Sequence, residues 1–500
     1  MNKRVLFIIL ALSIVNCQLL IGCDWRVLDT EGWTSPSPSP SVSASVPSSN
    51  PWATVPKKRY NELFGLAWDS AHITHPLSGS NRFNDDVYTL VYEGLFRLDE
   101  RFEPVPMLCK SIETSDDIHF TLTLEEAAFH DGAPLSAADV VYSLKNAGFD
   151  ARADGEAVAV TLNAPNARLA ARLITPIVQD GSIKRSFPWA GTGPYMFVND
   201  EHAGGEDYEG LGYHLEINTA WWRHGNLPLG RVELCDASRA DDLPYKMGVG
   251  DISLAVEDLG DTFGVTYRGD FERWSYPTTI LQYLSVNAAS PLLGSEDARN
   301  AVSLILDRSE LARTVYNGAA DPALLPIPPA SPLCPEYDGD DLTSNPRAFA
   351  ELCEILGWED SDFDGRLDYP SGRRERKPIE LRILVSEEDT IARHAAENIQ
   401  GQLLAAGIGA SVDARHIGTR VGDLEDALKN GEYELYMTCA DVRTSAVAAS
   451  ATSLGSLFET DMIPLLFRRQ TLLTQRGMVS GIEPLYKQPF YNISDWTVRK

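Results

Sequence analysis

An α/β fold built as two lobes is the architecture that this sequence predicts, and a strand–helix–strand unit is the first observation behind it. Residues 379–383 alternate between apolar and charged side chains, which is typical of a half-buried strand. Apolar side chains then recur at four-residue spacing over residues 391–403 and predict a helix, which Gly407 ends before a second strand at 408–412. A connection of this length implies two parallel strands joined by a helix.

A second observation is one pattern that occurs at two places. Residues 247–254 and 428–435 each contain the end of a helix, a glycine, an acidic turn and the start of a strand. Two such units, far apart in the sequence, predict two similar α/β lobes. Because a cleft between lobes is a usual place for a ligand, we expect the binding site there.

Further segments carry clear secondary-structure signals. Residues 88–96 are aromatic and β-branched and predict a strand, and residues 119–124 alternate with period two, as a half-buried strand does. Ser136 and Asp139 have the spacing of a capping box and predict the start of a helix. Residues 296–316 predict a helical region, because their apolar side chains gather on one broad face.

The first residues have the features of a secretory signal. Lys3 and Arg4 provide a positive start, and the apolar run at 5–15 is shorter than the ~20 residues that span a bilayer. The tetrapeptide LIGC that ends at Cys23 resembles a bacterial lipobox, in which the cysteine receives diacylglycerol. We therefore expect residues 1–22 to be a signal peptide and Cys23 to carry lipid, including an acyl chain such as palmitate. An ordinary signal with a chance cysteine is the alternative.

A low-complexity segment follows the lipobox. Residues 35–51 are rich in Ser, Pro, Val and Ala and lack the large apolar side chains that build a core. Prolines keep such a chain extended, and ~3.1 Å per residue gives a reach of ~50 Å. We expect residues 23–56 to be a tether between the lipid and a folded body; a tail without a role is the alternative.

Composition limits the classes of function. The chain has 500 residues with 44% hydrophobic and 23% charged side chains, which is typical of globular proteins, and its length suits two or three domains. No apolar run after the signal is long enough to span a bilayer. The net charge of −28 argues against nucleic acid as a partner, because such binding needs clustered Lys and Arg.

The cysteines leave their redox state open. Seven occur, and five remain once Cys17 of the signal and the lipid-bearing cysteine are set aside. An odd number excludes complete internal pairing. A disulfide that joins Cys334 and Cys353 and buried free thiols are both compatible with the spacing. The five are Cys109, Cys235, Cys334, Cys353 and Cys439.

Several motifs in one order resemble a known family. They are similar to the extracellular solute-binding proteins of the peptide/nickel class (family 5), which deliver ligands to ABC importers. The most specific stretch is FHDGAPLSAADVVYSL at 129–144, and LVYEGLFRLD at 90–99 and GTGPY at 191–195 add to it. Weaker matches follow at 103–108, at Asn218 with Trp221 and Trp222, and at 283–287, 298–308 and 317–323.

The resemblance implies a fold and a division of the chain. The fold is the two-lobed periplasmic-binding-protein-like fold of type II, with the extra subdomain of peptide binders and a ligand cleft between lobes that close by hinge bending. Lobe I is then expected at 57–85, 188–275 and 480–500, the extra subdomain at 86–187, and lobe II at 276–479.

The resemblance also implies site residues. Peptide binders of the family hold a ligand's ammonium with an aspartate just after a strand of the second lobe, and Asp441 stands at the matching position. A buried carboxylate there would form a charge-assisted hydrogen bond to a cation. Tyr92, Glu93 and Tyr283 are further candidates at the pocket edge, and each could instead belong to the core. The segment after Asp441 departs from the family pattern, which leaves the peptide specificity open.

Two acidic or histidine-rich segments could suggest metals. Residues 360–368 resemble the start of a calcium loop, with oxygen ligands at positions 1, 3, 5 and 9, but position 12 is Ser371 rather than glutamate. His72 and His75 form the one close pair among nine histidines. We expect neither a metal nor a cofactor, and no motif for a hydrolase or for phosphate binding occurs.

The sequence therefore predicts a non-enzymatic lipoprotein on the outer face of a cell membrane. We expect it to capture an oligopeptide or a similar cationic solute, to act as a monomer and to dock on an ABC permease. A surface receptor of the same fold without transport, or a carrier of a metal complex, are the alternatives.

Overall fold

The computed structural model describes residues 64–79, 82–199, 212–239, 242–258, 267, 269–442 and 461–499. The expected signal peptide, Cys23 and the expected tether lie outside the described residues. Over the described part of the chain, no helix is both long and apolar enough to cross a membrane.

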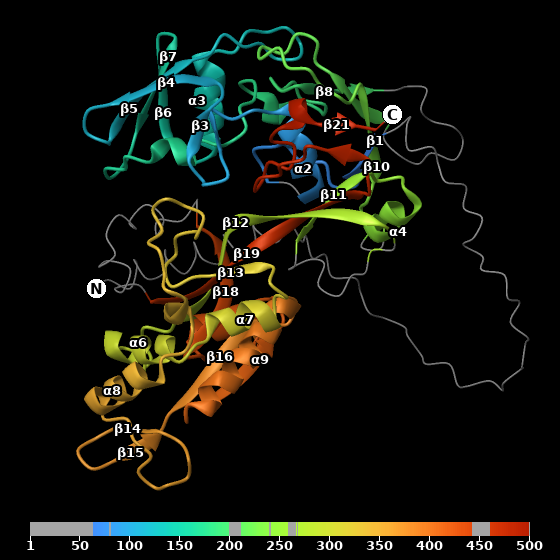
Figure 1. Cartoon of the computed structure of the whole chain (residues 1–500). Helices are drawn as coiled ribbons and strands as arrows, with labels where there is room; N and C mark the ends of the chain where they lie inside the picture. The colour runs from blue at the N-terminus through green and yellow to red at the C-terminus, as the bar shows by residue number, and fades with distance from the viewer. Residues whose placement is uncertain are drawn as a thin grey trace, which may run out of the picture.

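One 11-stranded sheet runs through the body and is shared by two lobes (Figure 1). Its strand order is β17-β16-β18-β12-β19-β11-β1-β10-β9-β8, and β13 pairs with β19 beside this path. The strands are β1 (Phe64–Trp68), β8 (Tyr195–Asn199), β9 (Tyr213–Ile217), β10 (Arg231–Asp236), β11 (Leu254–Asp258), β12 (Phe271–Val286), β13 (Ala320–Pro322), β16 (Glu380–Ser386), β17 (Gly409–Arg415), β18 (Leu435–Asp441) and β19 (Met462–Gln475).

Two long antiparallel strands, β12 and β19, belong to both lobes. In lobe I the second half of β19 lies between β11 and the first half of β12, whereas in lobe II the second half of β12 pairs with β18. Their register shifts between Pro277 and Leu281, where the chain passes from one lobe to the other. Proline offers no N–H to the ladder, so a bulge at this position is expected.

Lobe II contains the strand–helix–strand unit that the sequence predicts. α9 (Thr390–Ala405) connects β16 to β17, and these two strands are parallel in register from Glu380↔Gly409 to Ser386↔Arg415. Gly407 follows the helix with a φ of +81°, which glycine adopts without strain. The other helices of this lobe are α6 (Glu296–Leu304), α7 (Arg308–Thr314), α8 (Pro346–Leu356) and α10 (Leu424–Asn430).

The repeated pattern also corresponds to equivalent structures. In lobe I, α4 (Asp242–Val249) ends at Gly250 and leads into β11; in lobe II, α10 ends at Gly431 and leads into β18. Both glycines have a positive φ. β11 and β18 each pair antiparallel with one of the two long strands, so the prediction of two similar lobes is confirmed.

The carboxyl ends of the parallel strands in both lobes point toward the crossing. In lobe I, β11 ends at Asp258 opposite Gln470, and in lobe II, β18 ends at Asp441 opposite Ile280. Ligands of α/β sheets bind beyond the carboxyl ends of the strands. The carboxyl ends of β11 and β18 therefore both lie near the crossing of β12 and β19.

A separate four-stranded antiparallel sheet forms the extra subdomain at the upper left of Figure 1. Its order is β4-β5-β7-β6, and α3 (Ala137–Asn146) packs against it. The predicted capping box is present, because the Asp139 carboxylate accepts hydrogen bonds from the backbone N–H and the hydroxyl of Ser136. The strands are β4 (Cys109–Thr114), β5 (His119–Leu124), β6 (Asp150–Asp154) and β7 (Ala157–Thr161), and β2 (Phe96–Leu98) pairs with β3 (Pro104–Pro106) nearby.

The prediction of a strand at residues 88–96 is wrong over most of its length. Residues up to Val91 belong to helix α2 (Arg82–Val91), and only Phe96 begins a strand. The helix buries Asn84, Val87, Tyr88 and Val91, whose spacing of three and four residues defines one helical face. Burial of that face outweighs the weak local preference of aromatic and β-branched residues for strands.

The helical region predicted at 296–316 is confirmed and consists of two helices. α6 ends at Leu304 and α7 begins at Arg308, because the Asp307 carboxylate accepts a hydrogen bond from the N–H of Glu310 and starts a new helix.

The C-terminal segment, residues 476–499, returns to lobe I. Its β20 (Val479–Ser480) pairs with β21 (Thr497–Val498), and side chains including Ile482, Phe490 and Trp496 share a hydrophobic core with Trp68 of β1. Remaining short elements are β14 (Asp368–Pro370), β15 (Arg376–Pro378), η1 (Leu169–Arg172), η2 (Ser182–Lys184), η3 (Gly339–Leu342) and η4 (Ile493–Asp495).

We predict that Thr278→Val destabilises the crossing of β12 and β19. The buried Thr278 hydroxyl donates to the carbonyl of Arg468 at 2.5 Å and accepts from the N–H of Ile280 at 3.0 Å, replacing ladder bonds at the bulge. Valine has nearly the same shape but leaves both backbone groups unpaired, which costs about 1–3 kcal/mol or more. Urea titration measures the free energy of unfolding, with the exposed Thr121→Val as the control. An equal effect of both variants would contradict this role.

Candidate ligand-binding site

Asp441 lies at the end of β18, where the two lobes meet, and its side chain is almost fully buried. One carboxylate oxygen accepts a hydrogen bond from the Thr279 hydroxyl at 2.6 Å. The other accepts from the Tyr486 hydroxyl at 3.1 Å, and the ammonium of Lys487 lies 3.7 Å from the same oxygen. The surface-loop alternative for Asp441 therefore does not describe this residue, whose side chain is 2% exposed.

The partners of Asp441 come from both lobes. Thr279 belongs to β12 at the crossing, whereas Tyr486 and Lys487 belong to the C-terminal segment that packs in the core of lobe I. The carboxylate therefore joins the end of a lobe II strand to lobe I. The sequence had singled out Asp441 but neither Tyr486 nor Lys487, since no local pattern links residues 45 positions apart.

A buried polar network lies beside the crossing, on the lobe II side. The Arg468 guanidinium donates to the Gln282 side-chain carbonyl at 2.6 Å and to the Asp389 carboxylate at 3.0 Å. Gln282 in turn donates to the backbone carbonyl of Thr438 on β18 at 2.8 Å. Asp389 also accepts the hydrogen bond that begins α9. The network fixes α9 relative to both long strands and to the strand that carries Asp441.

Tyr283 lies on β12, close to Asp441 in the ladder but on the other face of the sheet. Asp441 pairs with Ile280, so alternation along the strand points Tyr283 to the opposite side. Its ring is buried with Leu281, Val442 and Phe467. The structure thus does not bring Tyr283 alongside the Asp441 carboxylate, and its contact with a ligand stays a prediction.

Glu93 lies between lobe I and the extra subdomain rather than at the crossing. Its carboxylate accepts hydrogen bonds from the Thr192 hydroxyl at 3.0 Å and from the indole N–H groups of Trp221 and Trp222 at 3.2 and 2.8 Å. The neighbouring Tyr92 is also buried, and its hydroxyl donates to the carbonyl of Trp189 at 3.0 Å. These bonds connect three of the motifs that resemble the family, at 90–99, at 191–195 and around Asn218.

Burial raises the pKa of Glu93 above its ordinary value of 4.5, although hydrogen bonds from Trp222, Thr192 and Trp221 oppose this rise. Burial likewise raises the pKa of the Tyr92 hydroxyl. Both side chains hold parts of the scaffold together in this conformation, and their role in contacting a ligand stays a prediction.

Polar side chains that the sequence reading missed lie at the carboxyl ends of other strands. In lobe I, Asp236 accepts hydrogen bonds from the hydroxyls of Ser70 and Ser238. In lobe II, Glu388 accepts from Ser386 and from a ring nitrogen of His416. Although burial opposes it, these hydrogen bonds lower the pKa of both carboxyls. Asp236 ends β10 and Glu388 follows the end of β16 by two residues, at the strand edge where ligands of α/β sheets bind.

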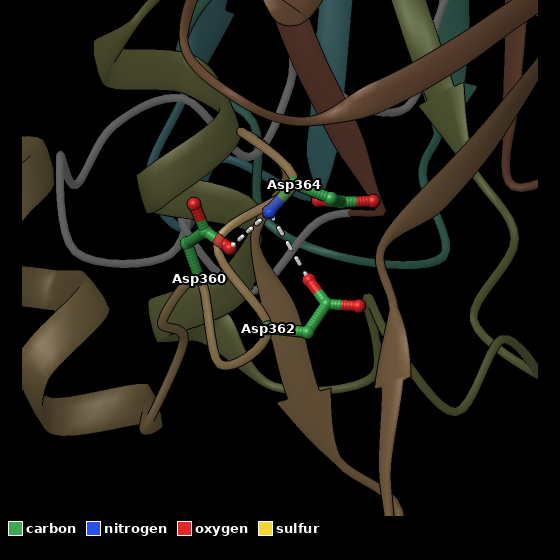
Figure 2. Close-up of side chains that lie close together, drawn as sticks. All are labelled: Asp360, Asp362 and Asp364. Atoms are coloured by element: carbon green, nitrogen blue, oxygen red, sulfur yellow. Dashed lines mark hydrogen bonds between the residues drawn. The ribbon is translucent and has the colours of Figure 1, made fainter.

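The acidic loop at 360–368 brings three carboxylates together, as Figure 2 shows. One oxygen each of Asp360, Asp362 and Asp364 lies within 4.8 Å of the others. The N–H of Asp364 donates to both of the other carboxylates, at 3.1 and 3.3 Å. Asp368, at position 9 of the calcium pattern, instead accepts hydrogen bonds from Ser361. Calcium binding stays an alternative with an incomplete ligand set.

The two histidines, His72 and His75, bind different partners rather than one common site. His72 binds the Asp69 carboxylate through Nδ1 at 3.0 Å, whereas His75 is buried and its Nε2 lies 3.0 Å from the Ser182 hydroxyl. Burial lowers the pKa of His75 to about 4, so it is neutral near pH 7. Cys334 and Cys353 are free thiols, which agrees with the thiol alternative rather than a disulfide that joins them.

Two α/β lobes that share one sheet, with strand carboxyl ends facing the junction, define a two-lobed binding protein of type II. The chain belongs to the bacterial extracellular solute-binding proteins of family 5, because the model of that family's middle region matches residues 103–444. Its homologues are substrate-binding proteins of ABC transporters, which are not enzymes. The predicted fold class and family are therefore confirmed.

Two curated relatives show how far the similarity extends. Protein XP55 of Streptomyces lividans is 27% identical over 343 residues, which are 60% of this chain and 60% of the relative. The glutathione-binding protein GsiB of Salmonella typhimurium is 22% identical over 387 residues, which are 70% of this chain and 69% of the relative.

Solved structures share the fold at low sequence identity. A nickel ABC transporter protein from Bacillus halodurans matches with a TM-score of 0.64 and 16% identity, over 85% of this chain and 97% of that one. The oligopeptide-binding protein AppA from Bacillus subtilis, in complex with a nonapeptide, matches with a TM-score of 0.56 and 16% identity, over 87% and 99% of the two chains. At these identities the comparison shows the fold alone.

We predict that Glu93→Gln changes how stability depends on pH. Because the folded-state pKa of Glu93 is raised, its contribution to stability is fully present below pH 4.5 and is lost as the pH rises through the folded-state pKa. Glutamine does not ionise, so the free energy of unfolding of the variant relative to the wild type shifts in favour of the variant as the pH rises. Denaturant titrations between pH 4 and 8 measure this difference.

The exposed Glu100→Gln serves as the matched control for that series. A difference between Glu93→Gln and wild type that stays constant over the whole pH range would show that Glu93 does not carry the dependence.

Proposed function

We propose that this protein captures a peptide, or a similar small cationic solute, between its lobes and delivers it to an ABC permease. The observation that carries the proposal is the position of Asp441, a nearly fully buried carboxylate at the junction of two lobes. In a site of low polarity, a carboxylate attracts an ammonium group more strongly than it does in water. Membership of the family and relatives that bind a nonapeptide or glutathione support this class of ligand.

The lobes supply a means of capture. The two lobes are joined by the adjacent strands β12 and β19, and in each lobe the carboxyl ends of the parallel strands face the crossing. Bending at the bulge after Pro277 would bring the edges together around a solute and exclude water. We propose this closure as the step that commits the ligand for delivery.

We further propose that the body is held at the outer face of the cell membrane by lipid on Cys23. The support is the sequence alone: a short positive and apolar start, the LIGC tetrapeptide, and the Ser/Pro-rich residues that follow. A tether of this kind would keep the binding protein at a high local concentration near its permease.

We predict that Cys23→Ser abolishes anchoring. Serine offers no thiol for attachment of diacylglycerol, so the variant should incorporate no labelled palmitate and should move from the membrane to the soluble fraction. Fractionation of cells that express the full chain measures both effects, with Cys17→Ser as the control. Retention of label by Cys23→Ser would contradict lipidation at this residue.

We predict that Asp441→Asn weakens the binding of a cationic ligand by about 2–5 kcal/mol, because the ligand's ammonium loses its buried counter-charge. Native mass spectrometry of the full chain, purified in detergent without refolding, first identifies co-purified ligand. Calorimetry with that ligand then compares wild type, Asp441→Asn and the exposed Glu354→Gln as a control. Unchanged affinity in Asp441→Asn would show that Asp441 does not bind the ligand.

The same mass spectra discriminate the alternatives. A series of peptide masses agrees with peptide capture. A single metal complex or small metabolite would instead support a carrier of that compound. A lack of any retained solute, together with no permease partner, would favour a surface receptor of the same fold.

A further inference from the structure

A tight turn in the C-terminal segment directs two side chains at Asp441. Leu485 and Gln488 exchange both backbone hydrogen bonds, at 3.2 and 2.8 Å, so Tyr486 and Lys487 form the tip of the turn. The Tyr486 hydroxyl donates to the Asp441 carboxylate at 3.1 Å, and the Lys487 ammonium lies 3.7 Å from the same oxygen. The ammonium also lies 5.7 Å from the Tyr486 ring.

The backbone of the turn suggests that the lysine side chain matters. Lys487 has a φ of +55°, a conformation that glycine or asparagine adopts more readily than lysine. A residue held in this region usually persists because its surroundings require it. Here the residue that accepts the strain also supplies a cation to a buried carboxylate.

The contact between Lys487 and Asp441 is longer than the hydrogen bonds that Thr279 and Tyr486 donate to the same carboxylate. Its separation of 3.7 Å exceeds the 2.6 Å to the Thr279 hydroxyl and lies beyond the range of a good hydrogen bond. The Lys487 side chain is 52% exposed, whereas that of Asp441 is 2% exposed. Half of the lysine side chain therefore borders solvent, where an ammonium is well hydrated, whereas the carboxylate is enclosed.

We propose that Lys487 is an internal cation that competes with the ligand for Asp441. This inference rests on the proposed function, and it adds a specificity-determining residue. When no external cation is bound, Lys487 compensates the buried charge and joins lobe I to lobe II. A ligand with a free ammonium displaces Lys487, whereas a ligand without one leaves the internal pair intact and binds without the help of Asp441.

The first experiment detects the internal contact without any ligand. Hydrogen–deuterium exchange of the full chain in detergent reports on the amides of residues 485–488. Lys487→Gln removes the charge and shortens the side chain by one atom, and it should accelerate exchange at the turn severalfold. Lys487→Arg should restore slow exchange, and the exposed Lys429→Gln is the matched control. Unchanged exchange in Lys487→Gln would overturn the internal contact.

The second experiment measures competition with two probes, the tripeptide Ala-Ala-Ala and its N-acetylated form. An ion pair with one exposed partner contributes up to ~1 kcal/mol, which corresponds to about fivefold in affinity. Removal of the competitor in Lys487→Gln should therefore raise the affinity for the free tripeptide about fivefold and leave that for the acetylated form unchanged. An unchanged or lower affinity for the free tripeptide would overturn the proposal.

The two measurements separate this inference from the function on which it rests. Tight binding of the free tripeptide that is insensitive to Lys487→Gln would overturn the competition and leave peptide capture standing. If the free tripeptide binds neither the wild type nor Lys487→Gln, both peptide capture and the displacement of Lys487 by a peptide ammonium are overturned. Faster exchange at the turn in Lys487→Gln would still support the contact between Lys487 and Asp441.

Discussion

The antiparallel pairing of β12 and β19 is the constraint on which the rest of the structure depends. These two strands run through both lobes, and they connect the strands of lobe I to the strands of lobe II within the main sheet. Their ladder holds the lobes together, and the proposed closure would also need it to be irregular enough to bend. The register shift after Pro277, with Thr278 replacing lost backbone bonds, satisfies both requirements at one place.

Buried polar groups are concentrated where these strands cross. Arg468, Gln282 and Asp389 connect the strands to the start of α9, and Asp441 connects the end of β18 to the C-terminal segment. Each group is costly to bury alone, so each is stable only in a geometry that provides its partners. The same cost limits the junction to a small number of allowed arrangements, as the proposed closure of the lobes would require.

Much of the fold could be predicted from the sequence because its signals are local. The strand–helix–strand unit through α9 follows from the spacing of apolar residues and from Gly407. The helices α4 and α10, each ending at a glycine, indicate the two lobes. The prediction of a strand at residues 88–96 was wrong because burial of one face of α2 (Arg82–Val91) decided the structure there. Asp441 was identified by resemblance, whereas its contact with Lys487 depends on a return of the chain to lobe I that no local pattern encodes.

The return of the C-terminal segment has a mechanical consequence. β1, the first described strand, and β21, the last, both lie in lobe I, so lobe II is attached to the body only in the middle of the chain. β1 is flanked by β10 and β11, so a pull that acts on Phe64 is borne within lobe I. The load does not pass through the crossing. Under the proposed anchoring at Cys23, a force on that side of the chain would therefore leave the relative position of the two lobes unchanged.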